Sequence, residues 1–114
     1  MFNARRKHEF LSTIESKATK KLYKWLFHHT FTHEQRYAKD IYDFNLERIE
    51  EWLADTVKSK KLKADYITLQ LDNLAAYLNW AYRKDYMYIR DNVLLDRSIR
   101  VKLGEKYGTT EDEF

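Results

Sequence analysis

The chain has 114 residues and a formal net charge of +3, which suits one ordinary domain and excludes a two-domain enzyme. It contains no cysteine, so a disulfide framework, a thiolate nucleophile and a thiolate metal site are excluded. No apolar run approaches the roughly 18 residues of a membrane-spanning helix, so we expect no membrane partner and a cytoplasmic location.

The counts of turn-forming residues indicate an all-helical (all-α) fold. The chain has two glycines and no proline, whereas strand-rich domains need such residues at short intervals. Hydrophobic residues make up 44% of the chain, which is enough to build a core. Both glycines, Gly104 and Gly108, stand beside the acidic end of the chain. We therefore expect one helical domain over residues 1–103, followed over residues 104–114 by an acidic tail or the start of a linker.

Two helices are expected near the start of the chain. Asn3 is the expected cap of a short helix to about Ile14, and Ser16 caps a longer helix to about Phe31. At about 100° per residue, the apolar sector of the longer helix contains Ala18, Leu22, Trp25 and His29, and it is flanked by Tyr23, Leu26 and Phe27. The opposite flank contains Lys17, Lys20, Lys21, Lys24 and His28. Because lysines at this spacing repel one another, the flank predicts contact with an anion such as a nucleic acid.

Capping patterns predict two further helices in the middle of the chain. Thr32 with Gln35 has the spacing of a capping box, which predicts a break and a short helix from His33 to about Asp40. Asn45 caps the next helix, whose apolar stripe consists of Leu46, Ile49, Trp52 and Leu53. The solvated side of that helix is acidic and consists of Glu47, Glu50, Glu51 and Asp55. We expect this acidic helix to face away from a nucleic acid.

The strongest periodicity follows a lysine-rich loop over residues 56–62. A helix over about residues 63–84 is predicted by one apolar seam of Ile67, Leu71, Leu74, Leu78 and Ala81. Tyr66, Gln70 and Asn73 lie beside the first turns of this seam. Gln and Asn amides can bind adenine edges, and lysines and tyrosine hydroxyls can hold phosphates. These side chains therefore predict a readout surface, although Gln and Asn are also common on any solvated helix.

The charge along the chain is distributed in blocks. Residues 1–30 contain seven Lys/Arg and two acidic residues, whereas residues 31–56 contain three Lys/Arg and seven acidic residues. Lysines then return in the loop before the long helix. Such blocks create a field that favours a polyanion at the basic parts, although a run of charge is more often only a solvated face.

The order of these motifs resembles the SAM-like core-binding domain at the N-terminal side of tyrosine recombinases and phage integrases. The family pattern begins Ser-x-x-Thr-x-x-x-aromatic-x-x-x-aromatic, and it is matched by Ser16, Thr19, Tyr23 and Phe27. The short helix of the family corresponds to residues 45–53, and the aromatic-rich end of its long helix corresponds to residues 77–93. The resemblance covers about residues 10–100. Asp85 and Val93 depart from it, because the family usually has glycine and proline at these positions.

The resemblance implies a compact orthogonal bundle of four to six helices that binds double-stranded DNA as one half of a clamp. In the family a separate C-terminal domain cleaves DNA with a tyrosine, so we expect no catalytic residue, metal, cofactor or small-molecule substrate in this chain. The full protein would act in site-specific recombination or, if it does not cleave, in phage gene regulation, inside a bacterial or phage-infected cell. Self-association is expected only on DNA or through a C-terminal domain outside this chain.

The resemblance and the charged faces together give a set of expected DNA contacts. The residues are Ser16, Lys17, Thr19, Lys20, Lys21, Lys24, Lys60, Lys61, Lys63, Tyr66, Gln70 and Asn73. The resemblance also implies a DNA contact from Tyr23. The angular position of Tyr23 around the helix is beside Leu26, however, which is equally consistent with a core position.

Two other interpretations stay open. His29 and His33, with His28 and Glu34, have a spacing that suits zinc, but the break predicted at Thr32 would separate them, and solvated histidines near phosphate are the simpler explanation. The alternative function is a helical adaptor without DNA binding. Such an adaptor would dock a partner helix on an aromatic surface of Trp25, Phe27, Phe31 and Tyr37.

Overall fold

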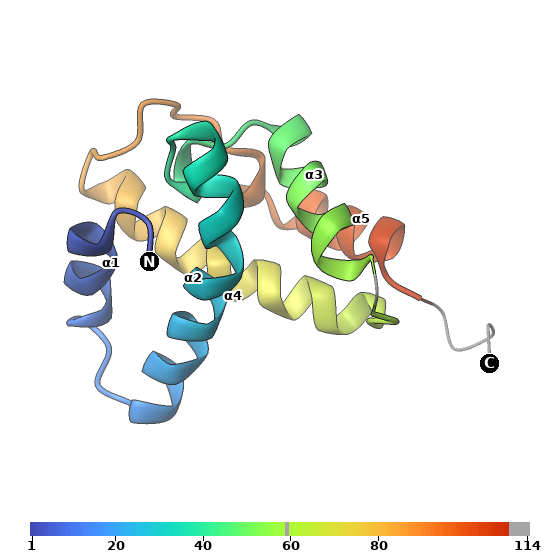
Figure 1. The fold of residues 1–114 in the computed structure, drawn as a ribbon, viewed down its shortest axis with the longest axis horizontal. Coiled ribbons are helices and arrows are strands. Elements are labelled where there is room, and N and C mark those ends of the chain that lie inside the picture. The colour runs from blue at the N-terminus through green and yellow to red at the C-terminus, as the bar shows by residue number, and fades with distance from the viewer. Residues whose placement is uncertain (59, 110–114) are drawn as a thin grey trace.

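The computed structural model describes residues 1–58 and 60–109, and Figure 1 shows them as a bundle of helices around a central α4. The elements are α1 (Ala4–Leu11), α2 (Lys17–Tyr37), η1 (Ile41–Asp43), α3 (Leu46–Val57), α4 (Ala64–Arg83), η2 (Val93–Leu95) and α5 (Arg97–Tyr107). In the described residues, bridge pairing is limited to one isolated pair, Lys63 with Thr109. The expected all-helical bundle is confirmed. None of the described helices has the length and hydropathy that a membrane span requires.

α2 is one continuous helix, so the break predicted at Thr32 is wrong. The helix runs through the predicted cap to Tyr37 and ends at Ala38, whose φ of 51° is left-handed. Its second half continues the buried face of the first half, because Thr30, His33 and Glu34 are all buried. Packing of this face outweighs the local capping pattern, which is a weak preference.

Side-chain caps start two of the helices as expected. The hydroxyl of Ser16 accepts a hydrogen bond from the Thr19 amide at 3.2 Å, and Asn45 Oδ1 accepts one from the Arg48 amide at 3.0 Å. The prediction for Asn3 is only partly right. Asn3 stands at the N-cap of α1 with a left-handed φ of 51°, but its side chain makes no cap bond and donates instead to Asp40 Oδ2 at 2.9 Å.

The core forms along the apolar seam of α4, which is confirmed in full: Ile67, Leu71, Leu74, Leu78 and Ala81 are all buried. Tyr77 and Trp80 pack beside it against Phe10 of α1, with ring centroids 5.1 and 5.5 Å away. The buried face of α2 is centred on the predicted flank of its apolar sector instead of on the sector itself. Tyr23, Leu26 and Phe27 face the core, whereas Ala18 is exposed and Trp25 is 39% exposed.

A buried charged network joins α1 to α2 and α4. Lys7 is fully buried, and its Nζ donates to Glu34 Oε2 at 2.5 Å and to Asp40 Oδ2 at 3.2 Å. It also donates to the Phe2 carbonyl at 2.7 Å. The hydroxyl of Tyr77 donates to the same Asp40 oxygen at 2.8 Å. Because buried charges need such partners, the network fixes where α1 sits.

α5 packs closely on α4 and crosses the boundary expected after residue 103. Gly104 is buried at the contact, and the chain continues in the packed structure as far as Thr109, whose amide donates to the Leu62 carbonyl at 2.7 Å. The residues of the expected tail from 110 to 114 lie outside the described residues.

Replacing Gly104 by alanine should lower the free energy of unfolding by about 1–3 kcal/mol. A Cβ at this position would lie 2.1 Å from Thr68 Oγ1 and 2.9 Å from the Ala64 carbonyl oxygen, so α5 must move away from α4. Urea denaturation followed by circular dichroism measures the change. Lys102→Ala, at an exposed position of the same helix, is the control and should change stability by less than about 0.5 kcal/mol. Equal stability of the Gly104 variant and the wild-type chain would contradict the packing described.

Candidate nucleic-acid interface

Four lysines form a basic surface on the first half of α2. This α2 lysine cluster consists of Lys17, Lys20, Lys21 and Lys24, of which Lys20 is half-buried and the others are exposed. None of the four forms an ion pair with any described residue. Their positive charge is therefore not neutralised within the described part of the chain, and it attracts polyanions.

The position of this cluster strengthens its attraction for anions. The first turn of α2 contains no acidic residue, and unsatisfied amides at the start of a helix carry a partial positive charge. Lysines near this end of a helix destabilise it unless an anion compensates them. Ser16 is the exposed cap of α2, and Thr19, whose amide it binds, is exposed one turn later. Both expected contacts thus lie beside the lysines.

Tyr23 belongs to the core, which resolves the choice left open by the sequence. Its ring is 6% exposed and meets Phe10 edge to face at a centroid distance of 5.0 Å. Burial also raises the pKa of the Tyr23 hydroxyl. A side chain held in this way has little surface to offer a phosphate.

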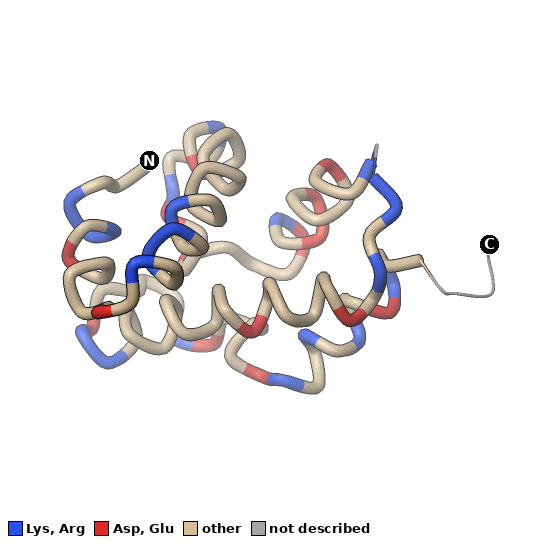
Figure 2. Tube along the Cα trace, turned by 90° about the horizontal axis from the view of Figure 1, so that it is seen from below, with Lys and Arg blue, Asp and Glu red and all other residues tan. Residues whose placement is uncertain are grey.

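A second basic surface lies on the segment that leads into α4. This loop lysine cluster consists of Lys58, Lys60, Lys61 and Lys63, and all four are exposed. Figure 2 shows the two clusters as separate blue stretches, one on α2 and one where the chain enters α4, with the first part of α4 between them. The segment is attached to the rest of the fold by the bond from Thr109 to Leu62 described above. The expected contacts Lys60, Lys61 and Lys63 are thus separated from the α2 lysine cluster.

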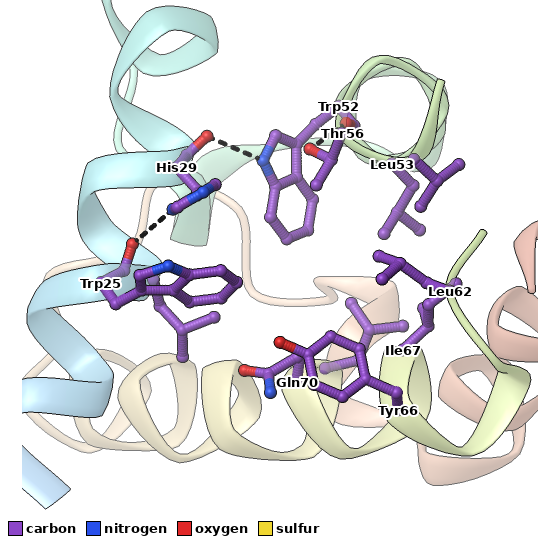
Figure 3. A pocket seen from close by; sticks show the side chains of 12 residues that line it. Trp25, His29, Trp52, Leu53, Thr56, Leu62, Tyr66, Ile67 and Gln70 are labelled. Atoms are coloured by element: carbon purple, nitrogen blue, oxygen red, sulfur yellow. Dashed lines mark hydrogen bonds between the residues drawn. The ribbon is translucent and has the colours of Figure 1, made fainter. Parts of the chain in front are cut away.

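The aromatic and amide side chains between the clusters share one pocket. Figure 3 shows Trp25 and His29 from α2 facing Tyr66 and Gln70 from α4, with Trp52 of α3 beside them. Trp25 and Tyr66 are 39% and 40% exposed and form the rim. The structure therefore brings two of the predicted readout residues, Tyr66 and Gln70, against α2. Asn73, one turn further along α4, is half-buried and does not line this pocket.

Sequence reasoning missed Trp25 and His29 as residues of this surface. It placed both in the apolar sector of α2, but the Trp25 ring packs against the His29 ring at a tilt, with a centroid distance of 4.0 Å. The Nδ1 atom of His29 lies 2.8 Å from the Trp25 carbonyl oxygen, and Trp52 Nε1 donates to the His29 carbonyl at 3.1 Å. Adjacent lysines gave no signal for this, because Tyr23 also adjoins Lys24 and is buried.

Acidic residues of α3 bind side chains of neighbouring helices. Three of them are bound: Glu50 by Lys106, Glu51 by Arg36 and Asp55 by His33. The first two are half-buried, so the prediction of a simply solvated acidic side is wrong for them. Hydrogen bonds from Lys106 to Glu50 and from Tyr37 to Glu51 lower the pKa values of both carboxyls. α3 borders the surface between α2 and α4, because Trp52 and Thr56 line that pocket and Asp55 lies in a neighbouring hollow with His29 and Lys60. The expectation that this helix faces away from a nucleic acid stays a prediction.

The four residues considered for zinc do not converge. Glu34 is bound to Lys7 inside the core, and His29 turns back to its own helix. A different group lies together, because ligand atoms of His33, Glu51 and Asp55 are within 4.8 Å of one another. His33 Nε2 lies 2.7 Å from Asp55 Oδ2. The hydrogen bonds and ion pairs of this cluster connect α2 to α3, and this connection accounts for the cluster.

The aromatic surface expected of an adaptor does not exist as a single face. Phe27 is fully buried against Tyr77, and Phe31 and Tyr37 are half-buried. Of the four residues predicted, only Trp25 is exposed, and it lies on the rim of the pocket between α2 and α4.

The chain was compared with protein families, curated proteins and solved structures. No curated protein and no solved structure matches the chain significantly. A family model does match, over residues 1–83, and its description is MrpR, N-terminal core-binding domain. The match ends at the last residue of α4 and includes both lysine clusters and the pocket between them. The chain belongs to the MrpR N-terminal core-binding domain family, an integrase-like core-binding domain.

Proposed function

We propose that this domain binds duplex DNA through the first half of α2 and the start of α4. The observation that carries the proposal is the pair of lysine clusters on either side of the pocket edged by Trp25, Tyr66 and Gln70. Lysine side chains suit the phosphates that border a groove, and the pocket between them suits the base edges. Glu50 and Glu51 of α3 are paired with Lys106 and Arg36, which reduces their repulsion of DNA.

Family membership supports the same proposal. An integrase-like core-binding domain holds DNA while chemistry is done elsewhere, as the resemblance noted from the sequence implies. In a recombinase the domain would grip the recombination site, and in a protein without cleavage it would occupy an operator and regulate transcription. Either role needs the same interface.

We also propose that the described chain does not cleave DNA itself. Tyr107 is the tyrosine nearest the end of α5, and its hydroxyl donates to Glu50 Oε1 at 2.9 Å. Burial and this hydrogen bond raise the pKa of Tyr107. A nucleophile needs the opposite shift or an effective base, and Glu50 is a weak base because its hydrogen bonds with Lys106 and Tyr107 lower its pKa.

Chemical-shift mapping tests the position of the interface. Adding a duplex of about 20 base pairs to the isotope-labelled chain should shift amide signals of residues 16–28 and 58–73. Signals of the exposed face of α3 and of Tyr88 should stay in place, and they serve as the internal control. Shifts confined to other surfaces would overturn the proposed interface, and no shifts at low salt would overturn DNA binding.

A further inference from the structure

The pocket between α2, α3 and α4 leaves an unfilled, partly open space of about 30 Å³. Its walls come from Trp25, Trp52, Leu62 and Tyr66, and the atoms that line it are apolar (Figure 3). A space of this size holds a group about as large as one water molecule. Because the exposed wall atoms are apolar, a small apolar group such as a methyl suits the space better than water does.

Gln70 also lines this pocket, and the oxygen of its amide is unsatisfied. Its Oε1 atom is buried without a hydrogen-bond partner among the described residues. A buried acceptor without a partner costs free energy, and rotation of the amide toward a bound donor would recover it. In the major groove adenine offers an N6–H donor and an N7 acceptor, which match the two ends of a glutamine amide.

A thymine methyl and an adenine edge occur together in an A·T pair. The methyl group projects into the major groove, and neither it nor the adenine pattern is present in a G·C pair. The α2 lysine cluster and the loop lysine cluster on either side supply the positive charge that a duplex requires. A neutral apolar peptide would gain nothing from these lysines.

We propose that the space beside Trp25 takes the C5 methyl of a thymine while Gln70 binds an adenine of the same or the next base pair. This inference rests on the proposed DNA binding and deepens it by naming the base pair that is read. It makes Trp25, Tyr66 and Gln70 specificity-determining residues, whereas the lysines position the backbone.

Fluorescence anisotropy with alternating duplexes tests this inference without knowledge of the natural site. The probes are d(AT), d(AU) and d(GC) duplexes of about 20 base pairs at one salt concentration. Uracil lacks only the methyl group, so affinity for d(AU) should be about fourfold lower than for d(AT). Affinity for d(GC) should be lower still, and all three should show the same salt dependence.

Two variants assign the effect to the pocket. Trp25→Ala should abolish the fourfold preference for thymine over uracil and leave the salt dependence unchanged. Tyr88→Ala is the matched control, because it removes an aromatic ring that is 91% exposed and lies outside the pocket, and it should keep the preference. Gln70→Ala should reduce the preference for d(AT) over d(GC) and keep that for thymine over uracil.

The outcomes separate this inference from the proposed function. Salt-dependent binding with equal affinity for d(AT) and d(AU) would overturn the proposed methyl site but not the proposed DNA binding. The space would then suit an apolar side chain of a protein partner. A thymine preference that persists in Trp25→Ala would also overturn it. Absence of binding to every duplex at low salt would overturn both proposals.

Discussion

Replacing Lys7 by methionine should lower the free energy of unfolding by about 3–5 kcal/mol. The substitution keeps an apolar chain of similar length but leaves Glu34 and Asp40 buried together without their cation. Domains of this size are stable by only about 5–15 kcal/mol, so the variant should be close to unfolding. Urea denaturation followed by tryptophan fluorescence measures the change. Lys17→Met, at an exposed position, is the control and should stay within about 0.5 kcal/mol of wild type.

The pH dependence of the same variant checks the cause. Burial raises the pKa of Glu34, and the Lys7 ammonium opposes that shift. Without Lys7 the folded-state pKa of Glu34 rises further above its unfolded value, so the folded state takes up a proton more readily. The loss of stability should therefore be greatest at neutral pH and shrink as the pH falls through the raised pKa. A deficit below about 1 kcal/mol at neutral pH would contradict the network described.

Reversing the charge of Lys20 and Lys24 to glutamate should weaken DNA binding about 10- to 100-fold for every sequence. The double variant should also reduce the slope of log affinity against log salt by about 0.9 for each phosphate that the variant no longer neutralises. The fold should be unaffected, because neither side chain is paired or fully buried. Anisotropy measures the binding, and circular dichroism verifies the fold.

A charge-matched control separates local binding from net charge. Lys84→Glu with Lys102→Glu also changes the net charge from +3 to −1, since each substitution removes one positive and adds one negative charge. Both lysines are exposed and lie outside the α2 lysine cluster and the loop lysine cluster. The control should weaken binding much less. Equal effects of the two double variants would show that α2 makes no specific contribution.

The sequence predicted those parts of the fold that depend on local pattern. The sequence predicted the apolar seam of α4 and the caps at Ser16 and Asn45, because periodicity and capping depend only on residues that are close together in the chain. For the candidate site, the sequence predicted which residues lie on its surfaces: the lysines of α2, and Tyr66 and Gln70 of α4. Which lysines touch DNA stays a prediction.

The remaining features depend on contacts between distant residues. Lys7 follows two arginines and has no local sign of burial, because its carboxylate partners come from the end of α2 and the loop after it. Gly104 looked like the start of a tail, but its missing Cβ permits the close approach of α5 to α4. The exposed position of Trp25 follows from a rotation of α2 about its axis that only tertiary packing determines.

The salt dependence of duplex binding tests the central claim most directly. Affinity of the chain for a mixed-sequence duplex should fall steeply between about 50 and 200 mM salt, and log affinity should be linear in log salt. A slope near −4 would correspond to about four or five neutralised phosphates, which the two lysine clusters can supply. An affinity that does not change with salt, or no binding at the lowest salt, would contradict the account of this surface as a DNA interface.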